Sequence, residues 1–352
     1  MDSTATKLLD DLLTTPGTSG YEQQVQEIVR GYVDGIADRV TTDLHGNVIA
    51  WKNPDAPCRI LIDAHCDQIG LLVTHIDDNG FVFCQTIGGW DPQQLVGQTV
   101  VIGTRQGPLS GVISRKAIHL LDEGERNQVV KLQDLWIDIG ASSRDEAREQ
   151  VSIGDPVTLR LGYTQLLNRR IAGPAMDDRV GLWVGLEAFR HAAAANPQCA
   201  LICVSAVQEE IGLRGAKTAA FGVDPHVGIA LEVTHATDCP TVDKRQLGDL
   251  RVGQGPVLFR GPNMNDKLFR ALTESAAATA SHYQVAATGK AASNDANAIQ
   301  LNRAGVATGL ISIPNRYMHS GVEVVSLDDL EHAATLLGHF LEHATPSTDW
   351  TP

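Results

Sequence analysis

The chain has 352 residues, of which 43% are hydrophobic and 20% charged, and its net charge is −14 at neutral pH. This length fits one large domain or two ordinary ones with a sizeable core. The acidic balance argues against a nucleic-acid-binding surface. No apolar run approaches the ~20 residues of a membrane span, and the first residues lack the pattern of a signal peptide. The six cysteines form no CxxC pair, which predicts reduced thiols in a cytoplasmic protein.

The first ~30 residues predict two helices. Leucines at positions 8, 9, 12 and 13 share one face of the first helix, which stops at Pro16-Gly17. The second helix lies in "SGYEQQVQEIVRGYV", where apolar residues recur on one face and Ser19 is the expected N-cap. The β-branched stretch "RILIDAHCD" then predicts a buried strand.

The character of the chain changes between residues 68 and 164, where short apolar segments alternate with turns such as "DDNG". This spacing predicts a small β-barrel or sandwich. Helices and strands alternate before and after it, which predicts an α/β sheet with helices on both faces. The elements expected after the insertion are helix 178–195, strand 199–207, a short helix near 215–221, strand 227–233, helix 266–281, strand 283–288, helix 294–303, strand 306–313 and helix 326–343.

The economical arrangement is therefore an α/β domain that a second, β-rich domain interrupts. We expect residues 1–67 and 165–352 to form the catalytic α/β domain. Residues 68–164 would form the insertion, whose size is consistent with one small domain.

Histidines and carboxylates stand at the ends of the predicted strands and at the start of one predicted helix. In an open α/β sheet, ligands gather at the carboxyl ends of the strands, so these side chains could converge. They are His65 and Asp67 in "DAHCD", Asp177 and Asp178 in "AMDDRVG", Glu209 and Glu210 in "VQEEIG", Glu232 in "ALEVT" and His319 in "RYMHSG".

This set favours a catalytic metal centre over a closed structural zinc site, because it combines imidazoles with carboxylates and contains no thiolate. Two histidines and three carboxylates are too many ligands for one catalytic ion, and they suit two divalent ions that share a bridging carboxylate. Asp67 stands two residues after His65, on the same face of a strand. From there it could accept the imidazole N–H and fix the tautomer that binds metal.

Each of these residues also has an interpretation without metal. Asp177 and Asp178 could form the N-cap and first turn of helix 178–195, where acidic residues are favourable. Glu209 and Glu210 could lie in water where a strand leaves the core, and a histidine at a strand end could face solvent. From spacing alone, both interpretations stay open.

Four stretches, in this order and spacing, resemble the M42 family of metallo-aminopeptidases. This family includes glutamyl and deblocking aminopeptidases and the tetrahedral TET peptidases of the dinuclear zinc exopeptidase clan. The resemblance covers nearly the whole chain. It implies a mixed central sheet and an inserted dimerisation domain, with dimers assembling into dodecamers. It also implies the hydrolysis of N-terminal residues from peptides with a free N-terminus, through a water held by two metal ions. The stretches are "DAHCDQIGLLVTHIDDNGFV", "GPAMDDRVG", "SAVQEEIGLRGAK" and "PNRYMHSGVEVVSLDDL".

The family pattern implies a role for each candidate residue. Zinc is the metal expected first, with cobalt or manganese as alternatives. By the resemblance, His65 and Glu232 bind metal 1, Glu210 and His319 bind metal 2, Asp177 bridges both metals, Asp178 follows through a cis peptide, Asp67 orients His65, and Glu209 is the general base. The chain departs from the pattern at Glu232, where Asp is common, at Gln68 in "HCDQIG" and at Gly321 in "HSGVE". None of these departures removes a metal ligand.

Three other functions compete with this hypothesis. Another dinuclear metal amidohydrolase, such as a deacylase or a carboxypeptidase, would share the metals and differ in which end of the substrate it holds. A glycosidase would need a facing pair of carboxylates, but Glu209 and Glu210 are expected to be strand neighbours that point to opposite faces. A non-catalytic assembly protein on the same fold would not depend on Glu209.

Overall fold

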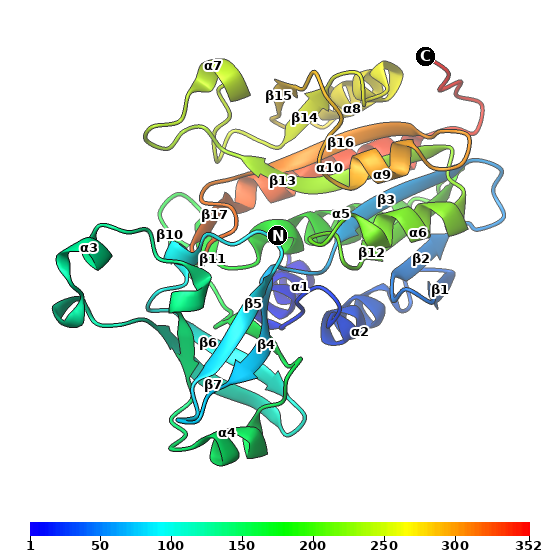
Figure 1. Ribbon diagram of the computed structural model, residues 1–352. Coiled ribbons are helices and arrows are strands. Elements are labelled where there is room, and N and C mark those ends of the chain that lie inside the picture. Colours follow the sequence, from blue (N-terminus) through cyan, green and yellow to red (C-terminus); the bar gives the residue numbers. More distant parts are fainter.

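An eight-stranded mixed sheet forms the centre of the α/β body in the computed structural model, which describes residues 1–352 (Figure 1). Its four central strands, β12, β3, β13 and β16, run parallel, and the flanking strands are joined to them by antiparallel pairs. Across the sheet the strands are β1 (Arg39–Thr42), β2 (Val48–Lys52), β12 (Ala200–Ala206), β3 (Arg59–His65), β13 (Val227–His235), β16 (Ala307–Asn315), β14 (Val257–Arg260) and β15 (Gln284–Ala287).

Helices cover both faces of this sheet, and the central strands β12 and β13 are accordingly buried along all or most of their length. One face packs against α1 (Ser3–Thr14), α2 (Gln23–Val33), α5 (Met176–Ala194), α8 (Asp266–Ala278) and α10 (Leu327–His343). The other face packs against α6 (Arg214–Val223) and α9 (Asp295–Gln300). No helix combines the length and the hydropathy that a membrane span requires.

A closed six-stranded barrel stands beside the body and forms the lower lobe in Figure 1. Around the barrel the strands are β4 (Gly70–Ile76), β5 (Val82–Ile87), β8 (Trp136–Asp138), β7 (Gly107–Ser114), β6 (Thr99–Thr104) and β9 (Pro156–Leu159). A three-stranded sheet links residues after the barrel to residues near the C-terminus through β10 (Thr164–Leu166), β11 (Arg170–Gly173) and β17 (Glu323–Ser326). The short helices are α3 (Glu123–Arg126), α4 (Arg144–Gln150) and α7 (Lys244–Leu247), with 3-10 turns at Pro92–Gln94, Ile118–Leu120 and Leu132–Asp134.

The predicted fold class is confirmed, because the chain contains a mixed sheet with helices on both faces and an inserted β-barrel. The expected leucine face of the first helix is buried. The bounds 1–67, 68–164 and 165–352 for the two domains stay a prediction.

Two local predictions are wrong. Ser19 is not the N-cap of the second helix, which begins at Gln23 with Glu22 before it, because the Ser19 hydroxyl donates to Asp67 instead. The strand expected at 199–207 ends at Ala206, and Gln208 adopts a left-handed backbone with φ of 58°. Glu209 and Glu210 lie in the loop after this strand, so the argument that strand neighbours point to opposite faces does not apply to them.

Candidate metal centre

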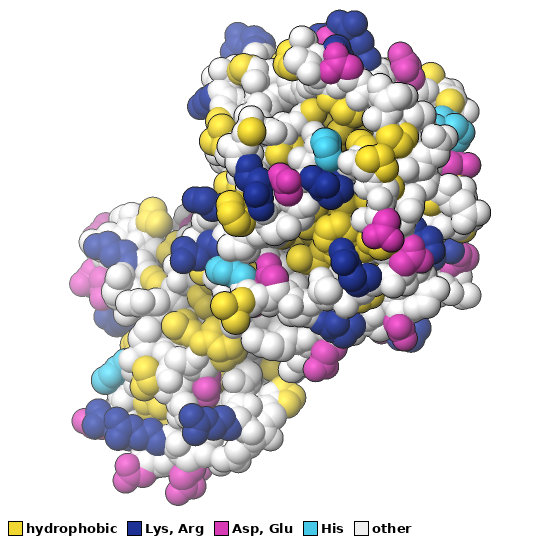
Figure 2. Space-filling model, turned by 90° about the vertical axis from the view of Figure 1, so that its right-hand side faces the viewer, with side chains coloured by type: hydrophobic (Ala, Val, Ile, Leu, Met, Phe, Trp, Pro, Cys, Tyr) yellow, Lys and Arg dark blue, Asp and Glu magenta, His cyan; other side chains and the backbone are white.

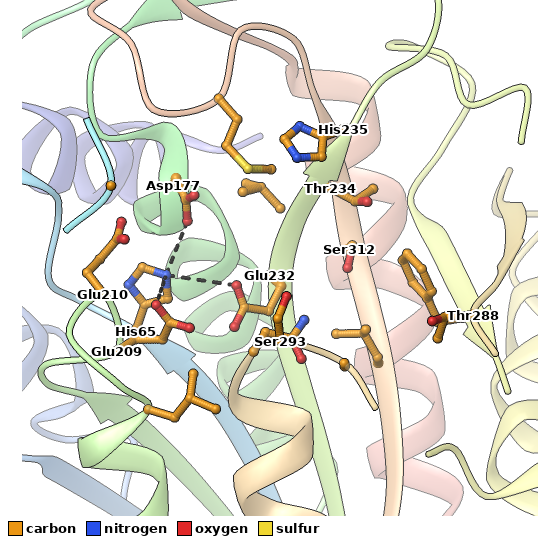
Figure 3. Close-up of a pocket in the computed structure, with 18 of the residues that line it drawn as sticks. His65, Asp177, Glu209, Glu210, Glu232, Thr234, His235, Thr288, Ser293 and Ser312 are labelled. Atoms are coloured by element: carbon orange, nitrogen blue, oxygen red, sulfur yellow. Dashed lines mark hydrogen bonds and ion pairs between the residues drawn. The ribbon is translucent and has the colours of Figure 1, made fainter. Parts of the chain in front are cut away.

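The candidate side chains gather at the carboxyl ends of the parallel strands (Figure 3). Each residue lies in a strand, in the loop that follows a strand, or at the start of a neighbouring helix. This is the usual place for ligand-binding residues in an open α/β sheet. His65 ends β3 and Asp67 follows it, Glu209 and Glu210 follow β12, Glu232 lies within β13, Asp177 and Asp178 lie in the first turn of α5, and His319 precedes β17. The peptide bond between Asp177 and Asp178 is cis.

Asp177 lies at the centre of the group, and each of its oxygens faces a different imidazole. Its Oδ1 is 3.1 Å from His65 Nε2, and its Oδ2 is 3.4 Å from His319 Nε2. Glu210 Oε2 is 3.5 Å from the same His319 nitrogen, and Glu232 Oε2 is 3.8 Å from the same His65 nitrogen. Two ligands bound to one tetrahedral zinc lie about 3.3 Å apart, given bonds of about 2 Å. The distances from His65 to Asp177 and Glu232, and from His319 to Asp177 and Glu210, are close to that value. They define two neighbouring positions for a metal ion, one beside each histidine.

Both histidines are oriented by an acceptor at Nδ1. His65 Nδ1 lies 3.1 Å from the main-chain oxygen of Asp67 and 3.4 Å from its Oδ1. His319 Nδ1 lies 2.8 Å from the carbonyl oxygen of Gly89, in the segment that follows β5 of the barrel. When Nδ1–H donates to these oxygens and Nε2 is deprotonated, each ring can present its Nε2 lone pair to a metal ion beside Asp177.

Asp67 also holds the loop that carries the two glutamates. Its Oδ1 accepts a hydrogen bond from Glu209 N at 3.0 Å, and its Oδ2 accepts from Glu210 N at 3.2 Å and from Ser19 Oγ at 2.6 Å. Burial alone would raise the pKa of Asp67, but His65 and these donors hold that pKa below its ordinary value. Asp67 is therefore an ionised acceptor that connects His65 to the glutamate loop.

Two contacts at the centre were not anticipated from the sequence. Glu323 Oε1 accepts from His319 N at 2.7 Å, and its Oε2 accepts from Asp177 N at 3.0 Å, so one carboxylate fixes the backbones of both residues. The position of Glu323, four residues after His319 in "HSGVE", was a usable signal. The contact of His319 with the Gly89 carbonyl had no signal in the sequence, because every residue has a main-chain carbonyl.

The site concentrates negative charge that burial makes unfavourable. Burial raises the pKa of Glu209 to about 8 and the pKa values of Glu210 and Glu232 well above their ordinary range. For His65, burial alone would lower the pKa, but hydrogen bonds to Asp177 and Asp67 raise it well above its ordinary value. Such a group needs either protons or cations to balance it.

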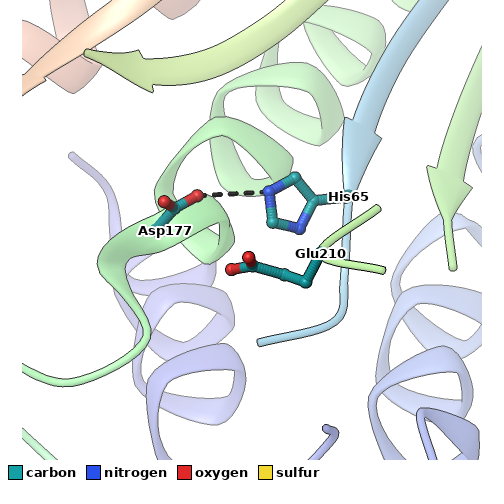
Figure 4. A group of neighbouring side chains, drawn as sticks. All are labelled: His65, Asp177 and Glu210. Atoms are coloured by element: carbon teal, nitrogen blue, oxygen red, sulfur yellow. Dashed lines mark hydrogen bonds and ion pairs between the residues drawn. The ribbon is translucent and has the colours of Figure 1, made fainter. Parts of the chain in front are cut away.

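The donor chemistry fits divalent metal ions. Two triads each place one ligand atom per residue within 4.8 Å of the others: His65–Asp177–Glu210, which Figure 4 shows, and His65–Asp178–Glu232. Glu210 Oε1 is buried and accepts no hydrogen bond from the protein, so an electropositive partner would satisfy it. Imidazole and carboxylate ligands without thiolates suit zinc, cobalt or manganese.

The candidate metal centre opens into a cavity of about 670 Å³, which runs between β13, β16 and the segment 288–294. Figure 3 shows His65, Asp177, Glu209, Glu210 and Glu232 at one end and Thr288 at the other. Apolar side chains such as Phe259 and Leu310 line it together with hydroxyl groups such as that of Ser312. A cavity of this size and mixed lining can hold a small organic substrate beside the metal centre.

The profile of the family described as M42 glutamyl aminopeptidase matches residues 46–336. The chain belongs to the M42 glutamyl aminopeptidase family. This M42 chain is 38% identical to the lysyl aminopeptidase of Pyrococcus furiosus, over 98% of this chain and 99% of that protein. The structure of a TET aminopeptidase from Thaumarchaeota archaeon SCGC AB-539-E09 superposes with a TM-score of 0.92 and 34% identity, over 97% of both chains.

The TET1 peptidase of Pyrococcus horikoshii is a further M42-like structure, with a TM-score of 0.85 and 30% identity over 97% of this chain and 100% of that one. That peptidase can assemble into a tetrahedron or a large octahedral shell. These findings confirm the resemblance and show that the M42 chain is a peptidase of the aminopeptidase type. None of them favours a deacylase or a carboxypeptidase.

Proposed function

We propose that this M42 peptidase removes N-terminal residues from peptides that have a free N-terminus, with two divalent metal ions per subunit. One observation carries the proposal: the two oxygens of Asp177 face two different imidazoles, Oδ1 toward His65 and Oδ2 toward His319. A carboxylate placed in this way is suited to bridge two adjacent ions.

The residues divide into two ligand sets around that bridge. Metal 1 would be held by His65, Asp177 and Glu232, and metal 2 by Asp177, Glu210 and His319. Glu232 stands where the family pattern commonly has Asp, and its longer side chain still reaches the site. Its Oε1 accepts from Asp295 N at 3.4 Å, which leaves Oε2, on the His65 side, as the ligand atom. Zinc is the first candidate, and cobalt or manganese suits the same donors.

Glu209 is the residue that we propose as general base. Its Oε2 lies 3.9 Å from His65 Nε2, its side chain lines the cavity, and no protein N–H or O–H donates to its carboxylate. When bound, the two ions would supply Lewis-acid polarisation of the scissile carbonyl and of a water molecule. Glu209 would take the proton from that water and pass it to the leaving amine, while Asp67 holds the Glu209 backbone.

The test uses amino-acyl p-nitroanilides with metal-stripped protein that is resupplied with zinc, cobalt or manganese. We expect no cleavage without metal, recovery on resupply, and no cleavage of the same substrates after N-acetylation. Release of acetate from the acetylated substrates, without release of p-nitroaniline, would instead indicate a deacylase. Release of the C-terminal residue from N-blocked peptides would indicate a carboxypeptidase. Hydrolysis of sugars in the presence of chelator would indicate a glycosidase.

We further propose that residues 68–164 form a dimerisation domain and that dimers assemble into a dodecamer. The segment between β7 and β8 leaves Ile118, Leu120 and Val129 exposed by 63%, 70% and 66%, and hydrophobic side chains are visible on the lower lobe in Figure 2. Such exposed apolar side chains favour burial against another subunit. The assemblies formed by TET1 of P. horikoshii support the proposal.

Sedimentation velocity tests the assembly. We expect the wild-type protein to sediment as a dodecamer and Leu120→Asp to sediment as smaller species with intact secondary structure. A wild-type monomer at micromolar concentration would contradict the proposal.

We also propose a cytoplasmic location for the protein. All six cysteines are free, and four of them are buried. Unpaired thiols fit a reducing compartment. Alkylation of the unreduced, denatured protein isolated from its cells should modify all six thiols.

A further inference from the structure

Three consecutive main-chain amides of the loop after β12 donate to carboxylates instead of to strand partners. Gln208 N donates to Glu22 Oε1 at 3.2 Å, Glu209 N to Asp67 Oδ1 at 3.0 Å, and Glu210 N to Asp67 Oδ2 at 3.2 Å. These bonds replace the sheet ladder, which ends at Ala206. The direction of the two glutamate side chains therefore depends on two carboxylates from other parts of the chain.

One of these carboxylates, and a partner of the other, come from the segment 17–22 between α1 and α2. Glu22 Oε1 accepts from Gly20 N at 2.7 Å in addition to Gln208 N, so a single oxygen ties the segment to the loop. Ser19 Oγ donates to Asp67 Oδ2 at 2.6 Å. The side chains of Ser19 and Glu22 are buried, each in a residue exposed by only 4%. Their partners are thus fixed and not replaceable by bulk water.

The segment is itself anchored to the body. Gln68 N donates to Gly17 O at 3.1 Å, and Thr18 and Gln68 form a parallel bridge. The buried guanidinium of Arg179, two residues after Asp177, donates to Thr15 O at 3.2 Å. The N-terminal end of the segment is consequently held both by the start of α5 and by the chain that follows β3.

We infer that Glu22 and Ser19 are positioning residues of the metal centre, which set the places of the Glu209 and Glu210 carboxylates through Gln208 and Asp67. The inference rests on the proposed function, in which Glu209 is the base and Glu210 a metal ligand. Without the Glu22 acceptor, the left-handed Gln208 is free to relax, and the carboxylate next to it moves. Small displacements of a reacting group cause large losses of rate.

Glu22→Ala and Glu22→Gln separate this role from a general structural one. Both donors use only Oε1, so the glutamine carbonyl can accept the same two bonds, whereas alanine removes them. We expect Glu22→Ala to lower kcat by about 10–100-fold, as found for partners that orient metal ligands, and to weaken metal retention. KM should change little, because Glu22 does not line the cavity. Glu22→Gln should keep most of the activity.

Hydrogen exchange supplies a readout that does not depend on activity. The amides of Gln208, Glu209 and Glu210 should exchange faster in Glu22→Ala and at the wild-type rate in Glu22→Gln. Ser19→Ala removes one hydroxyl and should accelerate the exchange of the same amides, but less than Glu22→Ala does. This variant provides the test if Glu22→Ala does not fold.

Asp329→Ala is the matched control. Asp329 is a fully buried carboxylate that also accepts two main-chain amides, from Gly253 at 2.7 Å and Gly255 at 2.6 Å, and it does not line the cavity. We expect it to lose stability but to keep the wild-type kcat and the slow exchange of residues 208–210.

Two results would overturn the inference. One is a Glu22→Ala variant with wild-type kcat and unchanged exchange at residues 208–210. The other is a Glu22→Gln variant as damaged as Glu22→Ala, since the acceptor geometry would then not be the cause. A wild-type protein without aminopeptidase activity would instead refute the proposed function, and exchange and metal retention would still decide the positioning role.

Discussion

Replacing Glu323 by glutamine tests how the chain fixes the two ends of the metal centre. Both oxygens of Glu323 are in use, because Oε1 accepts from His319 N at 2.7 Å and Oε2 from Asp177 N at 3.0 Å. The residue is only 2% exposed, so water does not replace either bond. Glutamine has one oxygen, and therefore one of the two amides must face an NH₂ group that is also a donor.

The cost follows from these two bonds. A buried N–H without an acceptor costs about 1–3 kcal/mol. We expect the metal-free variant to lose about 1–3 kcal/mol of unfolding free energy, measured by urea denaturation in the presence of chelator. Metal affinity should fall by about 10–100-fold in titrations of the same protein, because His319 and Asp177 lose their shared support.

Glu22→Gln is the natural comparison, since only one oxygen of Glu22 accepts hydrogen bonds and glutamine can replace it. If Glu323→Gln has the unfolding free energy and the metal affinity of the wild type, Glu323 does not fix the backbones of His319 and Asp177. A loss of stability with unchanged metal affinity would limit Glu323 to a role in folding.

Further predictions concern pH, packing and metal. Arg316 pairs with Asp238 through bonds of 2.8 and 2.6 Å and holds the pKa of that carboxyl below its ordinary value against the effect of burial. This stabilisation is present above about pH 4 and is lost as pH falls through the lower folded pKa. Asp238→Asn should thus cost about 2–3 kcal/mol at pH 7 and progressively less in acid, and a difference independent of pH would contradict this. A Cβ at Gly89 would lie 3.2 Å from His319 Nδ1, so Gly89→Ala should lower metal affinity, whereas Gly222→Ala, whose Cβ meets no atom within 4 Å, should not. Zinc at 100 times its Kd should raise the unfolding free energy of the metal-free protein by about 2.7 kcal/mol, and no change would argue against binding to the folded state alone.

The fold and the residues that make up the candidate site could be predicted from the sequence. The alternation of helices and apolar strands predicted the mixed sheet, and parallel strands bring residues as distant as His65 and His319 to one edge. The closed barrel matched the short strands and turns between residues 68 and 164. Whether each candidate serves as ligand or base stays a prediction.

The hydrogen bonds that orient the side chains of the site could not be predicted from the sequence, because they depend on tertiary contacts. Ser19 satisfies the local rule for an N-cap, but the buried carboxylate of Asp67 is a better partner and only the fold brings it near. β12 ends at Ala206, and the left-handed Gln208 follows it. Glu209 and Glu210, which we expected to be strand neighbours, are therefore loop residues that face one site. The carbonyl of Gly89 comes from the barrel and orients His319 without any residue-type signature.

The most direct test of the account measures metal content and turnover in the same sample of Glu209→Gln. We expect Glu209→Gln to bind two metal ions per chain, as the wild type does, with kcat lower by about 10²–10⁴-fold because only the proton acceptor is removed. Glu210→Ala in parallel should bind one ion fewer per chain. Turnover of amino-acyl p-nitroanilides by Glu209→Gln at the wild-type rate with full metal content would contradict the account.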